Sequence, residues 1–166
     1  MQTAEKIERT ALRNLIHNED YTRKVLPFLK SEYFQDRSER VVFSEIQKFI
    51  SQYNRRPTKE TLQIDLNKRK DLNEDEYKKI VELISSLDPQ DVDLEWLVNT
   101  TEKFCKDRAV HNAVMEGIHI IDGKDKKHSP EAIPEILRDA LSVSFDNAVG
   151  HDYLLDIEKR FDYYHK

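Results

Sequence analysis

The sequence predicts an all-α fold: a small helical bundle, then a long antiparallel helical hairpin, then the start of a linker helix. Glycine and proline are scarce, at 3 and 5 of 166 residues, which disfavours a turn-rich β fold. Apolar residues recur at helical spacing, and strand-like alternation is absent from the sequence. Charged residues make up 36% of the chain, but the 38% that are hydrophobic are periodic, so the composition predicts an ordered chain.

Residues 1–90 are predicted to form a globule of about five short helices. The first helix ends near His17, and Pro27 limits the length of the second. Tyr33 and Phe34 form an aromatic pair in a connecting turn, where they are expected to enter the core. The apolar positions of these two helices are Ala4, Ile7, Ala11, Leu12, Leu15 and Ile16, then Tyr21, Val25, Phe28 and Leu29.

Three further helices of this globule have recognisable starts. Asp36 and Glu39 have the spacing of a capping box, Thr58 precedes a fourth helix, and Asn73 with Glu76 has capping-box spacing again. Their apolar faces contain Val42, Phe43, Ile46, Phe49, Ile50 and Tyr53; Leu62, Ile64 and Leu66; and Tyr77, Ile80, Val81, Ile84 and Leu87. These patterns predict that the globule ends near residue 90.

The first arm of the hairpin is predicted over residues 93–121, a helix roughly 40 Å long. The acidic residues Asp91, Asp93 and Glu95 suit the positive amino-terminal end of the helix dipole, and Gly123 suits the carboxyl-terminal cap of the helix. Two apolar stripes run along it: Leu94, Val98, Thr101, Cys105, Ala109, Ala113 and Ile120, and Leu97, Phe104, Val114, Ile118 and Ile121. A single neighbouring helix covers one stripe, so a second partner is expected, from this chain or from another.

The second arm follows a short lysine-rich connection, and either Pro130 or Pro134 suits its first turn. Apolar residues from Ile133 to Leu141 fall on one face, and a short connection predicts an antiparallel hairpin. Two interpretations stay open: an ordinary bundle, or a hairpin that pairs with another molecule. If the hairpin pairs, its apolar surface, which is wider than one neighbouring helix covers, predicts the interface residues. They are Val110, Val114, Gly117, Ile118, Ile121, Ile133, Ile136, Leu137 and Ala140.

The domain organisation predicted is a globule over 1–90, a hairpin over 91–145 within the same domain, and a hinge with the start of a linker helix over 146–166. Gly150 marks the hinge. The residues after Gly150 form one more apolar stripe, for which the chain offers no evident partner helix. This stripe is therefore expected to dock on another molecule or to belong to a helix that continues. Its docking residues are Leu154, Ile157 and Phe161.

Charge and cysteine content exclude several functions. A net charge of −5 argues against tight, autonomous binding to a nucleic-acid backbone. Basic runs at 55–56 and 68–70 are interpreted as solvated helix ends. Cys105 is the single cysteine, so an internal disulfide and a cysteine metal cluster are excluded. The sequence has neither a signal peptide nor an apolar run that could cross a membrane, which predicts a cytosolic protein.

Catalytic motifs were sought without success, and catalytic, cofactor-binding and metal-binding residues are accordingly not assigned. Gly123-Lys124 fails the phosphate-loop pattern, since Asp125 follows it and the upstream glycine is missing. The histidines leave one enzymatic alternative, an all-helical metal phosphohydrolase of the His-Asp type. Its ligands would come from His111, His119, His128 and His151-Asp152. Isolated surface histidines are the commoner explanation.

Several stretches, in a specific order, resemble the amino-terminal domain of replicative DNA helicases of T-even-type phages, within the wider DnaB-like family. Ala-Leu-Ser-Val-Ser-Phe-Asp at 140–146 and Val-Gly-His-Asp at 149–152 are the most specific. The upstream elements are Leu12-x-x-Leu15-Ile16, Phe28-Leu29 with Tyr33-Phe34, Val42-Phe43-x-x-Ile46, Pro57-x-x-x-x-Leu62, Trp96-Leu97-Val98, Glu102-Lys103-Phe104 and Arg108-Ala109. The resemblance covers nearly the whole chain.

This resemblance implies a non-catalytic assembly and recruitment domain. In the family, hairpins pair between subunits, dimer pairs build a collar on a hexameric ring, and primase and helicase loader engage the collar. The RecA-like ATPase domain, which would bind ATP and Mg, is expected to be absent from this chain. DNA is therefore expected to be bound only by the full-length assembly. The cytoplasm of an infected bacterial host is the implied location. A free-standing helicase-loading or replication accessory adaptor remains the alternative.

Overall fold

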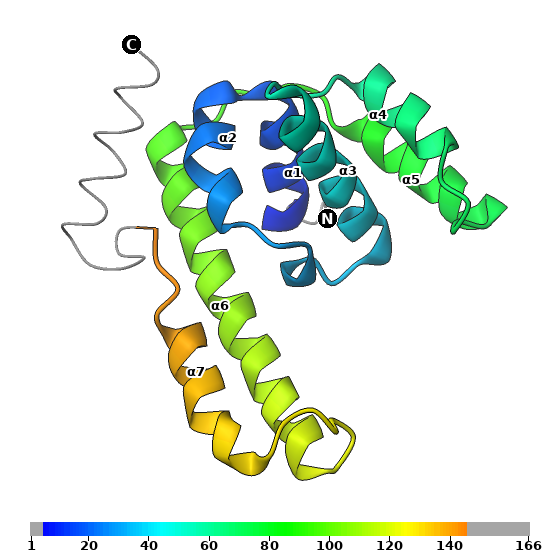
Figure 1. Ribbon diagram of the computed structural model, residues 1–166. Helices are drawn as coiled ribbons and strands as arrows, with labels where there is room; N and C mark the ends of the chain where they lie inside the picture. The colour runs from blue at the N-terminus through cyan, green and yellow to red at the C-terminus, as the bar shows by residue number, and fades with distance from the viewer. Residues whose placement is uncertain (1–4, 146–166) are drawn as a thin grey trace, which may run out of the picture. The chain divides into compact units, whose positions relative to one another are not determined.

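The computed structural model describes residues 5–145, and all seven α-helices in that range are connected by turns and 3-10 segments without a strand. Figure 1 shows their order. The helices are α1 (Ile7–His17), α2 (Glu19–Val25), α3 (Arg37–Tyr53), α4 (Lys59–Asn67), α5 (Glu74–Ser86), α6 (Leu94–Ile121) and α7 (Ile133–Leu141). The all-α prediction is confirmed. The predicted linker-helix residues Leu154, Ile157 and Phe161 lie outside the described residues.

The chain divides into two compact units, and the boundary falls between Thr101 and Glu102, within α6. The first unit contains α1 to α5 and the first turns of α6. The second contains the remainder of α6, the turn after it and α7. The division at residue 90 that the sequence suggests stays a prediction.

Capping explains where several helices of the first unit begin. The Asn73 and Glu76 side chains form both bonds of a capping box on α5. The hydroxyl of Thr58 accepts a hydrogen bond from Thr61 N at 3.1 Å at the start of α4. On α3 the prediction is half correct. Asp36 Oδ2 accepts from Glu39 N at 3.2 Å, but the Glu39 residue is buried rather than turned back to complete the box.

The core of the first unit combines buried residues from α1 to α5 and from the first turns of α6. Phe34 and Phe43 are fully buried and stack with ring centroids 5.1 Å apart, so the predicted insertion of the 33–34 pair into the core is confirmed. Tyr21 and Thr101 are also fully buried, and their hydroxyl groups are 2.8 Å apart. This bond satisfies two polar groups that would be costly to bury unpaired, and it ties α2 to the first part of α6.

Two basic side chains of this unit bind groups on distant segments of the chain. Arg56 Nη1 donates to the carbonyl of Ile16 at 2.8 Å, which satisfies a free carbonyl near the end of α1. Arg69 lies 3.5 Å from the buried carboxylate of Glu45. The interpretation of both basic runs as solvated helix ends is therefore wrong for these two arginines. A local charge pattern could not show that each has a partner on a distant segment.

The second unit is an antiparallel helical hairpin. A Cβ added to Gly117 on α6 would lie 3.6 Å from Ile133 Cγ2 at the start of α7. At the other end, Glu102 Oε2 accepts hydrogen bonds from Phe145 N at 2.7 Å and from Ser144 Oγ at 3.2 Å. Late α6 therefore pairs with early α7, and early α6 with the segment after α7, so the two arms run in opposite directions.

A candidate interaction surface on the hairpin

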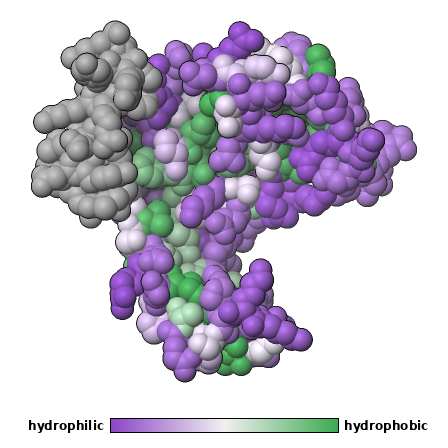
Figure 2. All heavy atoms as spheres, viewed as in Figure 1, coloured by the Kyte–Doolittle hydropathy of each residue, from purple (hydrophilic) through white to green (hydrophobic). Residues whose placement is uncertain are grey.

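The outer face of α6 in the second unit is apolar and exposed. We call the set Val114, Met115, Ile118 and Ile121 the hairpin stripe; their exposed fractions are 46%, 39%, 42% and 71%. The spacing of four residues from 114 to 118, with 115 beside it and 121 a turn beyond, places all four on one side of the helix. Figure 2 shows apolar residues among polar ones on this part of the molecule.

The opposite side of the same helix segment is buried. Residues Ala109, Ala113, Gly117 and Ile120 lie at 9% exposure or less or are classed as buried, and they recur every three to four residues. Three of the four positions hold small residues, and at Gly117 a Cβ added to the backbone would already be in van der Waals contact with Ile133 of the other arm. The hairpin is thus packed from inside, and its stripe is not needed for that packing.

The nine residues nominated from the sequence divide into three groups by burial. Val114, Ile118 and Ile121 are exposed in the hairpin stripe. Gly117 and Ala140 are buried, and the remaining four are half-buried: Val110, Ile133, Ile136 and Leu137. Sequence analysis did not nominate Met115, which joins the stripe, or Leu141, which is 72% exposed at the end of α7. Whether any of them contacts another molecule stays a prediction.

Glu102 holds the segment after α7 in place, a structural role that sequence analysis missed. Its carboxylate accepts the two bonds from residues 144 and 145 described above and so fixes the segment that leaves α7. Bonds to a carboxylate are stronger than bonds between neutral groups. A signal was present, since Glu102 is a carboxylate beside the apolar positions of α6, but its partner lies 43 residues away.

Replacing Glu102 with alanine should loosen the segment after α7. Loss of two charge-assisted bonds is expected to raise the exchange rate of the Phe145 amide hydrogen roughly tenfold, equivalent to about 1.4 kcal/mol. Hydrogen–deuterium exchange with peptide resolution measures this. Asp107→Ala is the control, because Asp107 is exposed on the same helix and pairs with Lys103. Equal exchange in both variants would contradict the role given to Glu102.

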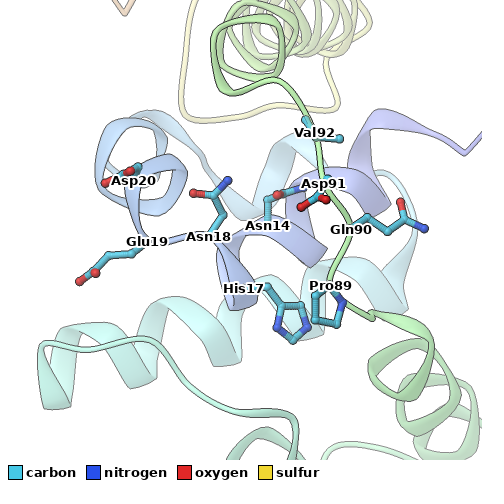
Figure 3. Close-up of a pocket in the computed structure, with 9 residues that line it drawn as sticks. All are labelled: Asn14, His17, Asn18, Glu19, Asp20, Pro89, Gln90, Asp91 and Val92. Atoms are coloured by element: carbon cyan, nitrogen blue, oxygen red, sulfur yellow. The ribbon is translucent and has the colours of Figure 1, made fainter.

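A cavity of about 460 Å³ in the first unit is another place where a ligand could lie. Figure 3 shows Asn14, Asn18 and Asp91 near its centre and Glu19 pointing away from them. The side chain of Asn14 donates to Thr10 O, and that of Asn18 accepts from Tyr21 N. These two amides are therefore engaged by the helices themselves, and we assign no ligand to this cavity.

Within residues 5–145, the structure does not bring together the histidines named for the enzymatic alternative. His111 and His119 are exposed on α6, and neither joins a set of potential metal ligands among residues 5–145. His128 does approach two carboxylates, on Glu116 and Asp125. Residues 151–152 lie outside the described range.

Burial raises the pKa of the Cys105 thiol to about 12, and Glu102 adds to this, so the thiol is not an activated nucleophile.

Within residues 5–145, none of the helices is both long enough and apolar enough to cross a bilayer.

The described fold defines an all-α protein that carries a helical hairpin with an apolar outer face. No protein-family model matches this chain. The chain is 37% identical over 158 residues to a protein of Enterobacteria phage T4 described as a "DnaB-like replicative helicase". This match covers 90% of the chain and confirms the resemblance predicted from the sequence. The chain spans about a third of the length of this curated relative, since 33% of the relative is covered.

Proposed function

We propose that this chain is an assembly and recruitment domain at the amino terminus of a replicative DNA helicase. Its hairpin pairs with the hairpin of another copy, pairs of domains build a collar on a hexameric ring, and the collar offers a docking surface to primase or to a helicase loader. In this proposal ATP hydrolysis and DNA unwinding belong to an ATPase domain of the full-length protein. Assembly and recruitment take place in the cytoplasm of the infected bacterial host. The domain itself supplies contacts rather than chemistry.

The observation that carries the proposal is the exposed hairpin stripe. Several large aliphatic side chains on one side of a helix are unusual on a surface that meets only water. The similarity to the phage T4 protein, which is described as a replicative helicase, supports a role in replication. The acidic balance of the chain, −5, fits a domain that meets proteins rather than the nucleic-acid backbone.

The expected strength of the pairing follows from the stripe. A fully buried aliphatic side chain contributes on the order of 1.5–3 kcal/mol before the costs of association are subtracted. Those costs are large, so the isolated chain is expected to pair weakly. In a full ring the other domains hold the hairpins at high effective concentration, and a weak contact then suffices.

Replacing Ile118 with aspartate should weaken self-association at least about tenfold, because a charge would have to be buried at the centre of the stripe. Light scattering and sedimentation across a range of protein concentrations measure the change. Ile64→Asp is the matched control: Ile64 is 57% exposed on α4, outside the hairpin, and should leave association unchanged. A wild-type mass that stays monomeric at every concentration, and is the same in Ile118→Asp, would refute hairpin pairing.

A further inference from the structure

We propose that the hairpin turn is a binding site for a divalent transition metal ion of the zinc class, held by Glu116, Asp125 and His128. The three residues lie in the second unit, one on α6 and two in the turn between α6 and α7. One potential ligand atom from each lies within 4.8 Å of the others. The inference is independent of hairpin pairing, because the site is formed by residues of a single chain.

The geometry is close to what a bound ion requires. His128 Nδ1 lies 3.1 Å from Asp125 Oδ2 and 4.0 Å from Glu116 Oε1. Ligands bound to zinc at about 2.1 Å are about 3.0–3.5 Å apart. The histidine–aspartate distance already falls in this range. The Glu116 oxygen has less than about 1 Å to move, and its side chain is 42% exposed.

One of the carboxylates is held in place by the turn itself. Asp125 Oδ1 accepts hydrogen bonds from the backbone amides of Lys127 at 2.8 Å and of His128 at 3.3 Å. With Oδ1 engaged, Oδ2 is directed at the imidazole. Metal sites commonly have this arrangement, in which the second oxygen of a ligating carboxylate is bound by the protein and fixes the direction of the first.

The donor set indicates which ion fits. One imidazole nitrogen and two carboxylate oxygens suit zinc and its first-row neighbours, whereas magnesium and calcium prefer oxygen ligands alone. Three protein ligands leave a coordination position for water. A divalent cation would also neutralise the two neighbouring carboxylates. Binding would join α6 to the turn and restrain the tip of the hairpin.

Isothermal titration of the metal-free chain with zinc chloride tests the proposal. We expect one ion per chain, with affinity reduced at least about tenfold in His128→Ala and in Glu116→Gln. His119→Ala is the matched control, since His119 is exposed on the same helix but outside the cluster, and it should bind as the wild type does. Circular dichroism establishes that the variants remain helical.

Two outcomes would overturn the metal site. The first is the absence of saturable binding by the wild-type chain. The second is binding that His128→Ala and His119→Ala weaken equally, which would reveal scattered surface histidines rather than a built site. Light scattering of the titrated samples separates this test from that of hairpin pairing. A monomer that binds one ion supports the site even if pairing fails, and a dimer without zinc supports pairing even if the site fails.

Discussion

Replacing Arg69 with alanine is expected to lower the free energy of unfolding by about 2–4 kcal/mol, a large loss for a surface-accessible arginine. The reason is its partner. The Glu45 side chain is 6% exposed, and its Oε1 lies 3.5 Å from Arg69 Nη1. Among the described residues, the other oxygen, Oε2, is buried without a hydrogen-bond partner. Without Arg69, a buried carboxylate would keep neither its ion pair nor a substitute, and an uncompensated buried charge is costly.

Urea denaturation of wild type and variant measures this loss, and Arg37→Ala is the control. Arg37 bonds Glu76 at 2.6 Å and lies 3.9 Å from Asp71, but its side chain is 52% exposed. Exposed pairs contribute at most about 1 kcal/mol, so its removal should cost little. Arg69 also bonds Asp71, and this bond keeps the pKa of Asp71 low, at about 2. Because that pair is exposed, we expect its loss to add little to the effect.

A double-mutant cycle separates the buried pair from the rest. In a Glu45→Leu background the buried charge is gone, so Arg69→Ala should cost less than about 1 kcal/mol. A cost that is the same in both backgrounds would show that Arg69 acts through its packing or through Asp71. A cost in the wild-type background no greater than that of Arg37→Ala would also contradict the assignment.

These partners illustrate what the sequence could and could not predict. Helix positions follow from local signals, and the starts of α4 and α5 are set by the capping residues Thr58 and Asn73, as predicted. The stripes of α6 were also identified from spacing alone. Periodicity shows which residues share a face but not what covers it. Leu97 and Ile118 belonged to one predicted stripe, yet Leu97 is fully buried in the first unit and Ile118 is exposed in the second.

Contacts between distant segments were beyond reach for a related reason. Tyr21 and Thr101 are 80 residues apart, and neither has a neighbour that identifies the other as its partner. The same holds for Glu102 and Phe145. Hydroxyl and carboxylate groups near an apolar face are common in sequences, and only a folded chain shows which of them are buried and therefore must be paired. The candidate metal site was missed because Glu116 lies on α6, whereas Asp125 and His128 lie in the turn that follows it.

Replacing Glu39 with glutamine should stabilise the chain by about 2 kcal/mol at pH 8 and leave its stability nearly unchanged at pH 4. Burial raises the pKa of Glu39 from 4.5 to about 7, and the carboxylates of Glu8 and Asp36 add to this, while Arg9 and Lys6 oppose it. The folded chain therefore holds a proton between pH 4.5 and 7 that the unfolded chain has released. The contribution of Glu39 to stability is therefore greatest below about pH 4.5 and falls as pH rises through 7.

The magnitude follows from that shift. A pKa difference of about 2.5 corresponds to roughly 3 kcal/mol at pH above 7, the cost of ionising a carboxyl group in the folded state. Glutamine avoids this cost at every pH. Glu39 lies in the first turn of α3, however, where a negative charge interacts favourably with the helix dipole by about 0.3–1 kcal/mol, and glutamine loses that term. The net gain at pH 8 is the difference between the two.

Thermal or urea unfolding between pH 4 and 8 measures the effect, with Glu82→Gln as the control. Glu82 is exposed on α5, so its substitution should change stability by less than about 0.5 kcal/mol at either pH. A gain for Glu39→Gln that is equal at pH 4 and pH 8 would come from packing rather than ionisation. A lower stability of Glu39→Gln at pH 8 would mean that the folded chain stabilises the charged Glu39 carboxylate, which contradicts the raised pKa.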